Sequence, residues 1–313
     1  MLFAMVMLLA LGLEALLGWP AAIYTRIGHP ITWLGATIAA CDKRFNRAGD
    51  SDLSRRLAGV GVVLVLGAAV WLGTSALVWL LPGGWLGVLL QAALAWPLVA
   101  ARSLYDHVRA VALPLAHHDL TAARKAVSLI VGRDPARLDG AGVARAALES
   151  LGESTSDGVV APLFWGVIFG LPGIAVYKLI NTMDSMIGHL TPRHAAFGWA
   201  AARLDDLVNL IPARLTGLIF VAVSGNWRAA LACMLADAGK HRSPNAGWPE
   251  AALAGALNVR LSGPRAYDDA LSDDPWVNAG AADPTALDVA RGLAVYLRAM
   301  AALAALLLFL ALI

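Results

Sequence analysis

The chain contains 313 residues, of which 59% are hydrophobic and only 15% are charged. Its mean hydropathy of +0.66 is too high for an ordinary soluble domain and predicts an integral membrane protein. The formal net charge of +2, without an array of basic and aromatic residues, argues against a nucleic-acid partner. Cys41 and Cys233 lie far apart and form no CxxC motif, so neither a disulfide framework nor a cysteine-based zinc site is expected.

Six apolar runs are near the length that a helix needs to cross a bilayer. They cover approximately residues 1–18, 58–81, 85–101, 159–177, 208–224 and 293–313. No basic residue precedes Arg26, so the first run lacks the charged start of a cleaved signal peptide and is expected to remain as a helix. We therefore predict an all-α integral membrane protein with several transmembrane helices, organised as a single membrane domain over residues 1–313.

Basic residues concentrate in two segments between these runs, residues 19–57 and 102–157. Counting the intervening spans places both segments on one side of the membrane, and the positive-inside rule predicts that this side is cytoplasmic. The N-terminus would then lie outside. The segment at about residues 102–157 is predicted to be a soluble insert of amphipathic helices, with Asp119 and Asp139 as N-caps.

The fourth apolar run is interrupted by Pro162 and by a Gly-Leu-Pro-Gly sequence at residues 170–173, which indicates a broken or re-entrant helix. If this run crosses the membrane fully, residues 178–206 lie outside. If it re-enters, the polar residues on both sides of it face the cytoplasm. We favour re-entry or a cavity, because a divided active site is chemically awkward. A further segment, at about residues 226–292, is predicted to be a polar loop region, rich in Pro, Gly and Asp toward its end.

A dense polar block extends from Glu149 to Arg214, beside these apolar runs. One charged side chain at the membrane centre costs about 2.5–3.5 kcal/mol, so this block is the first hypothesis for an active site. Its first cluster combines two carboxylates, Glu153 and Asp157, with three hydroxyls. These groups suit Mg²⁺ and a polyphosphate. The alternative is a helix N-cap with solvated acids.

The second cluster has helical spacing and contains Lys178, Asn181, Asp184 and Ser185. Residues three or four apart share a helix face, so this segment presents a cation, an amide and an acid together. Such a group at a membrane edge could hold a phosphate and its metal. The alternative is that Lys178 snorkels to the interface and that Asp184 pairs with an arginine.

The third cluster contains Arg203, Asp205, Asp206, Asn209 and Arg214. Adjacent aspartates place at least one acid on any buried face of a helix. The alternative is an ion pair between Arg203 and Asp206, worth a few tenths of a kcal/mol. That pair alone would leave Asn209 and Arg214 unexplained.

The fourth cluster is a loop with Pro and Gly turns that carries His241, Arg242 and Asn245. Such a loop can fold over an anion, with arginine as a bidentate phosphate partner, although by itself it also fits a surface turn. The sequence contains no Walker A motif, no GxGxxG fingerprint and no GxSxG elbow. Bound ATP would therefore be held without the usual phosphate loop.

Ordered motifs extend over nearly the whole chain. They are Gly18-x-Pro20, His29-Pro30-Ile31 with Gly35, Val131-Gly132-Arg133-Asp134, Arg145-Ala146 with Glu149, Glu153 to Phe164, Tyr177-Lys178, Asn181-Thr182-x-Asp184-Ser185-Met186-x-Gly188, Phe197-Gly198-Trp199, Ala202-Arg203-x-Asp205-Asp206, Asn209, Pro212-Ala213-Arg214 and His241 to Glu250. This set resembles the adenosylcobinamide-phosphate synthase family, membrane proteins of cobalamin biosynthesis that attach the aminopropanol arm. Two positions depart from the family pattern: Trp19 replaces the usual acid, and Ser154 replaces the usual Asn.

The resemblance implies an amide-forming carbon–nitrogen ligase. Its substrates would be adenosylcobyric acid and (R)-1-amino-2-propanol phosphate or a similar amino alcohol, with adenosylcobinamide phosphate as the product. ATP would activate the carboxylate, and Mg²⁺ would accompany the ATP. The implied metal ligands are Glu153, Asp157, Asp184 and Asp206, and the implied catalytic acids are these four with Asp205. The implied substrate-binding residues are Lys178, Asn181, Ser185, Arg203, Asn209, Arg214, His241, Arg242 and Asn245.

The implied location is the cell inner membrane, with the active site facing the cytoplasm. The implied partners are the lipid bilayer, the corrinoid and amino-alcohol phosphate substrates, and other cobalamin-biosynthesis enzymes. Intramembrane charges and broken helices are also typical of transporters. A transporter, or a scaffold for corrinoid intermediates, is therefore the alternative. The sequence shows no repeated halves, and clustered acids and arginines favour the enzyme.

Overall fold

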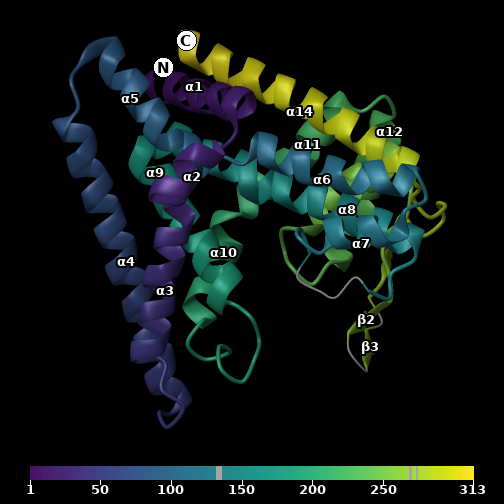
Figure 1. The fold of residues 1–313 in the computed structure, drawn as a ribbon, viewed down its shortest axis with the longest axis horizontal. Coiled ribbons are helices and arrows are strands. Elements are labelled where there is room, and N and C mark those ends of the chain that lie inside the picture. Colours follow the sequence, from purple (N-terminus) through teal and green to yellow (C-terminus); the bar gives the residue numbers. More distant parts are fainter. Residues whose placement is uncertain (132–135, 268–269, 273) are drawn as a thin grey trace. The chain divides into compact units, whose positions relative to one another are not determined.

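Helices form nearly all of the regular structure in the computed structural model (Figure 1), which describes residues 1–131, 136–267, 270–272 and 274–313. In the described chain, four helical stretches are long and apolar enough to cross a membrane, or up to six if each bent pair forms one span. The four are Asp52–Leu80, Gly84–Ala116, Gly140–Ile187 and Ala286–Leu312, and the bent pairs are Leu2–Leu17 with Ala21–Phe45 and Trp199–Val208 with Leu210–Val223. The predicted all-α membrane class is confirmed, since each predicted apolar run overlaps one of these stretches.

The chain divides into two units, and each is described by itself. The first unit contains residues 1–100, 161–209 and 307–313, and the second contains residues 101–160 and 210–306. Three members of the family motif at Val131 to Asp134, namely Gly132, Arg133 and Asp134, lie outside the described residues.

The first unit is built from long helices that pack along one another. They are α1 (Leu2–Leu17), α2 (Ala21–Ile27), α3 (Pro30–Phe45), α4 (Asp52–Leu80), α5 (Gly84–Ala95), the 3₁₀ turn η1 (Trp96–Leu98), α9 (Ala161–Ile187) and α10 (Trp199–Val208). Helix α9 contacts α1, α3, α4 and α10, so it forms the centre of this unit. Ile38, Leu179 and Met183 are among the fully buried side chains at these contacts.

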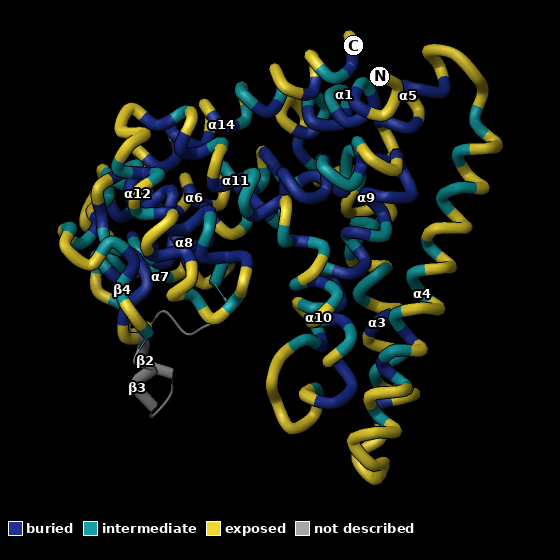
Figure 2. Tube along the Cα trace, turned by 180° about the vertical axis from the view of Figure 1, so that it is seen from behind, coloured by how far each residue is buried: buried dark blue, intermediate teal, exposed yellow. Residues whose placement is uncertain are grey.

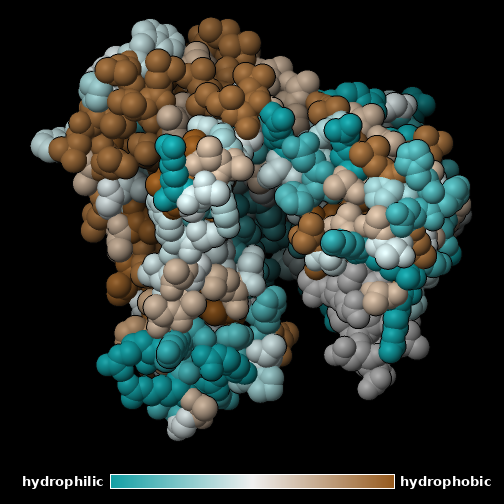
Figure 3. All heavy atoms as spheres, viewed as in Figure 1, coloured by the Kyte–Doolittle hydropathy of each residue, from teal (hydrophilic) through white to brown (hydrophobic). Residues whose placement is uncertain are grey.

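Helix α4 exposes most of its apolar surface. Ser51 caps it, since the Ser51 hydroxyl accepts a hydrogen bond from the Ser54 amide at 3.3 Å. Trp79 is 83% exposed and Leu80 is 71% exposed, and the outer side of α4 is largely exposed along its length (Figure 2). Hydrophobic residues cover the α1 and α5 end of this unit, whereas hydrophilic residues gather at the opposite end, near the α3–α4 turn (Figure 3). A large exposed apolar face of this kind is typical of contact with lipid.

Helix α9 is broken near its middle, as the sequence predicts. Gly170 has φ 66° and ψ −151°, and Pro172 follows within the same helix. Glycine adopts positive φ without steric cost, and proline cannot donate the backbone hydrogen bond that a continuous helix requires. A Cβ atom at Gly170 would also lie 2.9 Å from the ring of Phe3 in α1. The break therefore combines backbone geometry with close packing; re-entry into the membrane stays a prediction.

The second unit packs shorter helices around α8 and α13. It contains α6 (Ala101–Ala116), α7 (Leu120–Val127), α8 (Gly140–Thr155), the π-helical turn η2 (Ser156–Val160), α11 (Leu210–Val223), α12 (Trp227–Asp237), the 3₁₀ turn η3 (Ala238–Lys240), α13 (Gly247–Leu257) and most of α14 (Ala286–Leu312). The predicted N-caps are confirmed. Asp119 accepts a hydrogen bond from the Ala122 amide at 3.0 Å, and Asp139 accepts one from the Gly142 amide at 2.7 Å.

Residues 226–292, predicted as a polar loop region, contain α12, η3 and α13 before the loop proper begins. Small residues allow two of these helices to pack at backbone contact. A Cβ atom at Gly255 would lie only 2.6 Å from the carbonyl oxygen of Ala229, so α13 packs directly on α12. After Asn258 the chain forms two antiparallel pairs, β1 (Leu261–Ser262) with β4 (Trp276–Val277) and β2 (Arg265–Tyr267) with β3 (Ala270–Ser272). Leu261 is opposite Val277, and Ala266 is opposite Leu271.

Candidate functional site

A chain of hydrogen-bonded polar side chains joins α9 to α10. The Tyr177 hydroxyl donates to Asn209 Oδ1 at 2.9 Å, and Asn209 Nδ2 donates to Asp205 Oδ2 at 3.0 Å. Asn181 Nδ2 lies 3.4 Å from the other carboxylate oxygen, Asp205 Oδ1. Asp205 therefore accepts hydrogen bonds on both of its oxygens from side-chain amides. We call Tyr177, Asn181, Asp205 and Asn209 the Asp205 network.

Three of the four residues of the Asp205 network are buried and Asn181 is half-buried, in helices that belong to a candidate span and to a candidate bent span. Tyr177 is 2% exposed, Asn209 is 1% exposed and Asp205 is 9% exposed. A polar group buried without a partner costs about 1–3 kcal/mol of stability. The hydrogen bonds among these side chains avoid that cost. These hydrogen bonds also fix the orientation of the Asn209 side-chain amide and of the Asp205 carboxylate, so a site that requires a well-oriented acid is preorganised.

Two further acids lie close to the network. Asp184 on α9 and Asp206 on α10 both interact electrostatically with Asp205. Both are half-buried. Within the described chain, Asp184 forms no ion pair with an arginine, whereas Asp206 pairs with Arg203 at 3.5 Å. The packing of α10 on α9 therefore brings these acids close to one another, which the spacing within either helix does not predict.

The remaining predicted residues of this unit differ in their surroundings. Lys178 is half-buried and interacts electrostatically with His29, the N-cap of α3. The Ser185 hydroxyl donates to the Asn181 carbonyl at 2.9 Å on the exposed side of α9. The Arg203 side chain is 69% exposed. The i, i+3 pair with Asp206 that formed the structural alternative is therefore present, but it accounts for neither Asp205 nor Asn209.

Close backbone contacts set the position of α10 against its neighbours. A Cβ atom at Gly198 would lie 1.6 Å from the carbonyl oxygen of Ile187 at the end of α9. A Cβ atom at Gly59 in α4 would lie 1.9 Å from the carbonyl oxygen of Phe197. Real Cβ atoms do not approach oxygen so closely, so both positions require glycine. The connection between α9 and α10 is consequently held at backbone contact on both sides.

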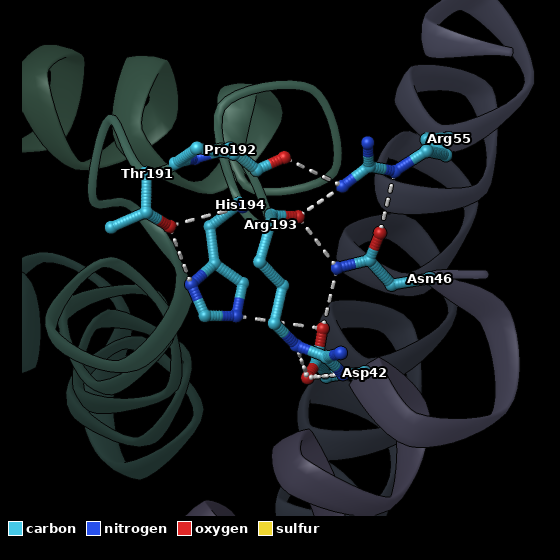
Figure 4. Close-up of polar contacts among 7 residues, drawn as sticks. All are labelled: Asp42, Asn46, Arg55, Thr191, Pro192, Arg193 and His194. Carbon is cyan, nitrogen blue, oxygen red and sulfur yellow. Dashed lines mark hydrogen bonds and ion pairs between the residues drawn. The ribbon is translucent and has the colours of Figure 1, made fainter. Parts of the chain in front are cut away.

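A polar cluster that the sequence analysis did not identify holds the same connection (Figure 4). Asp42 accepts hydrogen bonds from Arg193 Nε at 3.1 Å, from Arg193 Nη2 at 2.6 Å and from Asn46 Nδ2 at 2.7 Å. His194 Nε2 lies 3.6 Å from Asp42 Oδ1. Arg55 at the start of α4 donates to Asn46 Oδ1 at 2.8 Å and also donates to the Arg193 carbonyl. We call these five residues the Asp42 cluster; it ties α3 and α4 to the loop before α10.

The second unit contains the predicted loop of His241, Arg242 and Asn245. His241 Nδ1 accepts from the Ser243 amide at 2.9 Å, and His241 Nε2 lies 3.8 Å from Oε1 of the buried Glu250. Arg242 is exposed and pairs with Asp274 at 2.8 Å. The histidine thus faces a buried acid, whereas the arginine of the same loop faces outward.

Arg214 connects this loop to α11. Its Nη1 donates to the Leu210 carbonyl at 2.7 Å and lies 3.5 Å from Asn245 Oδ1. Its guanidinium carbon lies 4.5 Å from the ring centroid of Trp248, a distance typical of a cation–π contact. Arg214, His241 and Asn245 therefore belong to one packed polar group, and Trp248 and Glu250 complete it. The sequence motif contained both of these residues but suggested no role for either.

The Glu153 cluster occupies the junction of α8 and η2. Glu153 lies in the last turn of α8, so the N-cap of the structural alternative is wrong for this residue, whereas its exposure fits the solvated acid of that alternative. Asp157 is half-buried in the π-helical turn η2. Short π-helical turns occur frequently at functional sites. In the part of the chain that the structure describes, the buried Ser156 hydroxyl has no hydrogen-bond partner, which is unusual for a buried polar group.

Protein side chains alone do not form a metal site in the described chain, where no three His, Cys, Asp or Glu residues come together suitably. Mg²⁺ in phosphate-transfer sites is usually bound by only one or two carboxylates, with substrate phosphates and water as the other ligands. Asp184 and Asp206 offer such carboxylates on α9 and α10. The donor set therefore fits a magnesium ion that arrives with a phosphate-bearing ligand.

Buried, hydrogen-bonded acids and amides on apolar helices define this chain as a polytopic membrane protein with a preorganised polar centre. Residues 7–296 match the family model described as CobD/Cbib protein, and the chain belongs to this family. The resemblance drawn from the sequence motifs is thereby confirmed.

Curated relatives named "Cobalamin biosynthesis protein CobD" match almost the full length of the chain. The relative from Rhodobacter capsulatus is 61% identical over 300 residues, which cover 96% of this chain and 94% of the relative. The relative from Sinorhizobium sp is 45% identical over 317 residues, or 99% of this chain and 98% of the relative. The relative from Brucella suis biovar 1 is 45% identical over 299 residues, or 93% and 91%. No solved structure matches this chain.

Proposed function

We propose that this protein catalyses the ATP-dependent formation of an amide between adenosylcobyric acid and (R)-1-amino-2-propanol phosphate, or a similar amino alcohol, giving adenosylcobinamide phosphate. Membership of the cobalamin-biosynthesis family supports the pathway. The observation that carries the choice of an enzyme is the Asp205 network, because a buried acid held by two amides, one of them fixed in turn by a tyrosine, is an oriented catalytic group. A bare anchoring surface would not require it.

Amide formation requires a base for the incoming amine and cations for the phosphates of the substrates. Asp205 is the proposed base, since both of its oxygens are already positioned by amide donors. Lys178 and Arg214 are the proposed phosphate-binding cations of the first and second units. His241 is proposed to exchange a proton with the substrate, because Glu250 faces its Nε2 atom at 3.8 Å.

ATP and Mg²⁺ belong to the same proposal. Asp184 and Asp206 are the proposed magnesium ligands, and Glu153 and Asp157 are the proposed ligands in the second unit. When bound, the magnesium nucleotide would supply the phosphoryl group that activates the propionate carboxylate. The residues of the chain would orient this carboxylate, exclude water and hold the amine. The inner membrane, with the site facing the cytoplasm, is the proposed location, because the basic loops predict that orientation.

The test is a turnover assay with purified, detergent-solubilised protein. The assay contains adenosylcobyric acid, aminopropanol phosphate, Mg²⁺ and ATP, and mass spectrometry follows the corrinoid product. Product that depends on both ATP and Mg²⁺ is expected. Product without ATP would contradict activation by phosphorylation while retaining the synthase. If folded protein binds the corrinoid but makes no product, the transporter or scaffold becomes the better interpretation.

A further inference from the structure

A pocket in the second unit lies apart from every residue assigned above. It has a volume of about 250 Å³ and opens between the α11–α12 turn, the end of α13 and one face of α14. Its polar lining consists of Ser224, Asn226, Arg291 and Arg298, and no aspartate or glutamate lines it. The wall is completed by small and apolar residues of these elements: Gly225, Ala256, Leu257, Ala294 and Val295.

The two arginines give this pocket a positive charge. Arg291 and Arg298 are seven residues apart on α14, so they occupy the same face two turns apart. Arg291 donates to Asp288 at 2.8 Å. Asp288 is already engaged, since it accepts from both the amide and the hydroxyl of Thr285 at the start of α14. In the described chain no carboxylate pairs with Arg298, whose Nε donates to the Ala294 carbonyl at 3.2 Å. The two arginines therefore carry more positive charge than Asp288 neutralises, and this charge is available to bind an anionic ligand.

Hydrogen-bond donors from the opposite wall complete the pocket. The backbone N–H of Asn226 donates to the Ser224 hydroxyl oxygen at 3.0 Å, which leaves that hydroxyl hydrogen to be donated elsewhere. Helix α12 begins at Trp227 and has no side-chain cap, so its first backbone amides are available near the pocket. Guanidinium groups, a hydroxyl and backbone amides are the groups that proteins use to bind phosphate oxygens.

The pocket also lies where charged sequence gives way to apolar sequence. Residues 299–313 of the chain contain no charged side chain, so Arg298 is the last charge on α14. Helix α11, which belongs to a candidate bent span, ends at Val223 immediately before the pocket. Trp227 is 51% exposed beside it, with the Arg228 guanidinium 5.2 Å from its ring centroid. Exposed tryptophan and arginine at the end of an apolar helix are typical of the membrane interface.

We propose that this pocket binds the phosphate headgroup of an anionic membrane lipid, with Arg291 and Arg298 as the principal contacts. Soluble phosphate has the same chemistry, but the position at the end of α11 and at the last charge of α14 favours a lipid. The acyl chains would follow the uncharged part of α14. This binding site is independent of the proposed synthase activity, since none of its residues belongs to the Asp205 network, the Glu153 cluster or the His241 loop.

The test measures lipid binding by the full-length protein in detergent, using native mass spectrometry with added phosphatidylglycerol or with phosphatidylcholine of the same acyl chains. Wild-type protein should bind phosphatidylglycerol more tightly. One interfacial arginine contributes about fivefold to the binding of anionic lipid. Arg291→Gln and Arg298→Gln should therefore each weaken it about fivefold, and the double variant about 25-fold. Arg298→Lys, which keeps the charge, should retain most of the binding.

Lys125→Gln provides the matched control, because Lys125 is an exposed cation of α7 outside the pocket. It should bind phosphatidylglycerol like the wild type, and size-exclusion profiles should confirm that all variants are folded. Equal affinity of the double variant and the control would overturn the proposal. A second arm titrates inorganic phosphate without lipid. Thermal stabilisation of the wild type by phosphate, absent in the double variant, would overturn the lipid assignment in favour of a soluble phosphate.

Discussion

The hydroxyl of Tyr177 offers the sharpest test of the Asp205 network. Tyr177→Phe removes one oxygen and leaves the ring in place, so the carbonyl oxygen of the Asn209 side chain loses its donor at 2.9 Å. Asn209 is only 1% exposed, and a buried polar atom without a partner costs about 1–3 kcal/mol. The free energy of unfolding should fall by about that amount. The Asn209 amide is then free to turn, which weakens its 3.0 Å contact with Asp205.

A second buried tyrosine separates this orienting role from simple stability. Tyr296 is 1% exposed, and its hydroxyl donates to the Ala101 carbonyl at 2.6 Å in the second unit. Tyr296→Phe should therefore lose similar stability without disturbing Asp205. Displacing a catalytic group by about 1 Å can lower the rate by roughly a hundredfold. We expect Tyr177→Phe to lower kcat roughly tenfold or more, and Tyr296→Phe to leave kcat near the wild-type value.

The assay is the turnover measurement with adenosylcobyric acid and aminopropanol phosphate, combined with thermal unfolding of each variant in the same detergent. Activity is compared at a temperature where every variant is folded. If Tyr177→Phe retained full kcat, the orienting role of the network would be refuted. The same conclusion would follow if both phenylalanine variants lost activity in proportion to their lost stability.

Three further predictions address the proposed metal ligands, the α9–α10 connection and the thiol of Cys233. Asp184→Asn and Asp206→Asn should lower activity roughly a hundredfold and raise the Mg²⁺ concentration required for half-maximal rate; unchanged magnesium dependence would exclude them as ligands. Gly198→Ala places a Cβ 1.6 Å from a backbone carbonyl oxygen of α9 and should lower the free energy of unfolding by roughly 3 kcal/mol. Gly61→Ala, at a position of α4 with nothing within 4 Å, is the matched control in thermal unfolding. Burial raises the pKa of the Cys233 thiol from 9.0 to about 11, so iodoacetamide at pH 8 should alkylate it about a hundredfold more slowly in the native than in the unfolded protein. Equal alkylation rates would contradict a half-buried, protonated thiol at Cys233.

Ion pairs to a single aspartate join α8 to the loop that precedes α14 in the second unit. Arg260 donates to both carboxylate oxygens of Asp283, at 2.9 and 2.5 Å, and Arg145 pairs with the same acid. The hydrogen bond from Arg260 is the main reason that the pKa of Asp283 lies below its usual 3.8. Trp276 lies against both arginines, with its ring centroid 4.3 Å from the Arg260 guanidinium carbon. These contacts give Arg145 of the family motif a structural role that its spacing did not indicate.

The amino-acid sequence by itself determined the class of the protein, most helices and the set of candidate residues. Membrane-spanning helices and helix caps such as Asp119 and Asp139 depend only on residues that are close together in the sequence, so the sequence alone predicts them. The break in α9 was also predictable, because glycine and proline change the local backbone directly. Helical spacing brought Asn181 and Asp184 together on α9. Tyr177 could have been added by the same reasoning, since it lies four residues before Asn181.

Only the tertiary structure decided how these residues are used. Asp42 and Arg193 meet although 151 positions separate them, and Glu149 accepts from the Ser262 amide across 113 positions. No local pattern signals such pairs, because they depend on which helices pack together. Packing likewise separated two neighbours on α10, burying Asp205 in a hydrogen-bond network and leaving Asp206 to pair with an exposed arginine. Local preferences act over one or two helical turns, whereas the partner of a buried polar group is chosen by the whole packing arrangement.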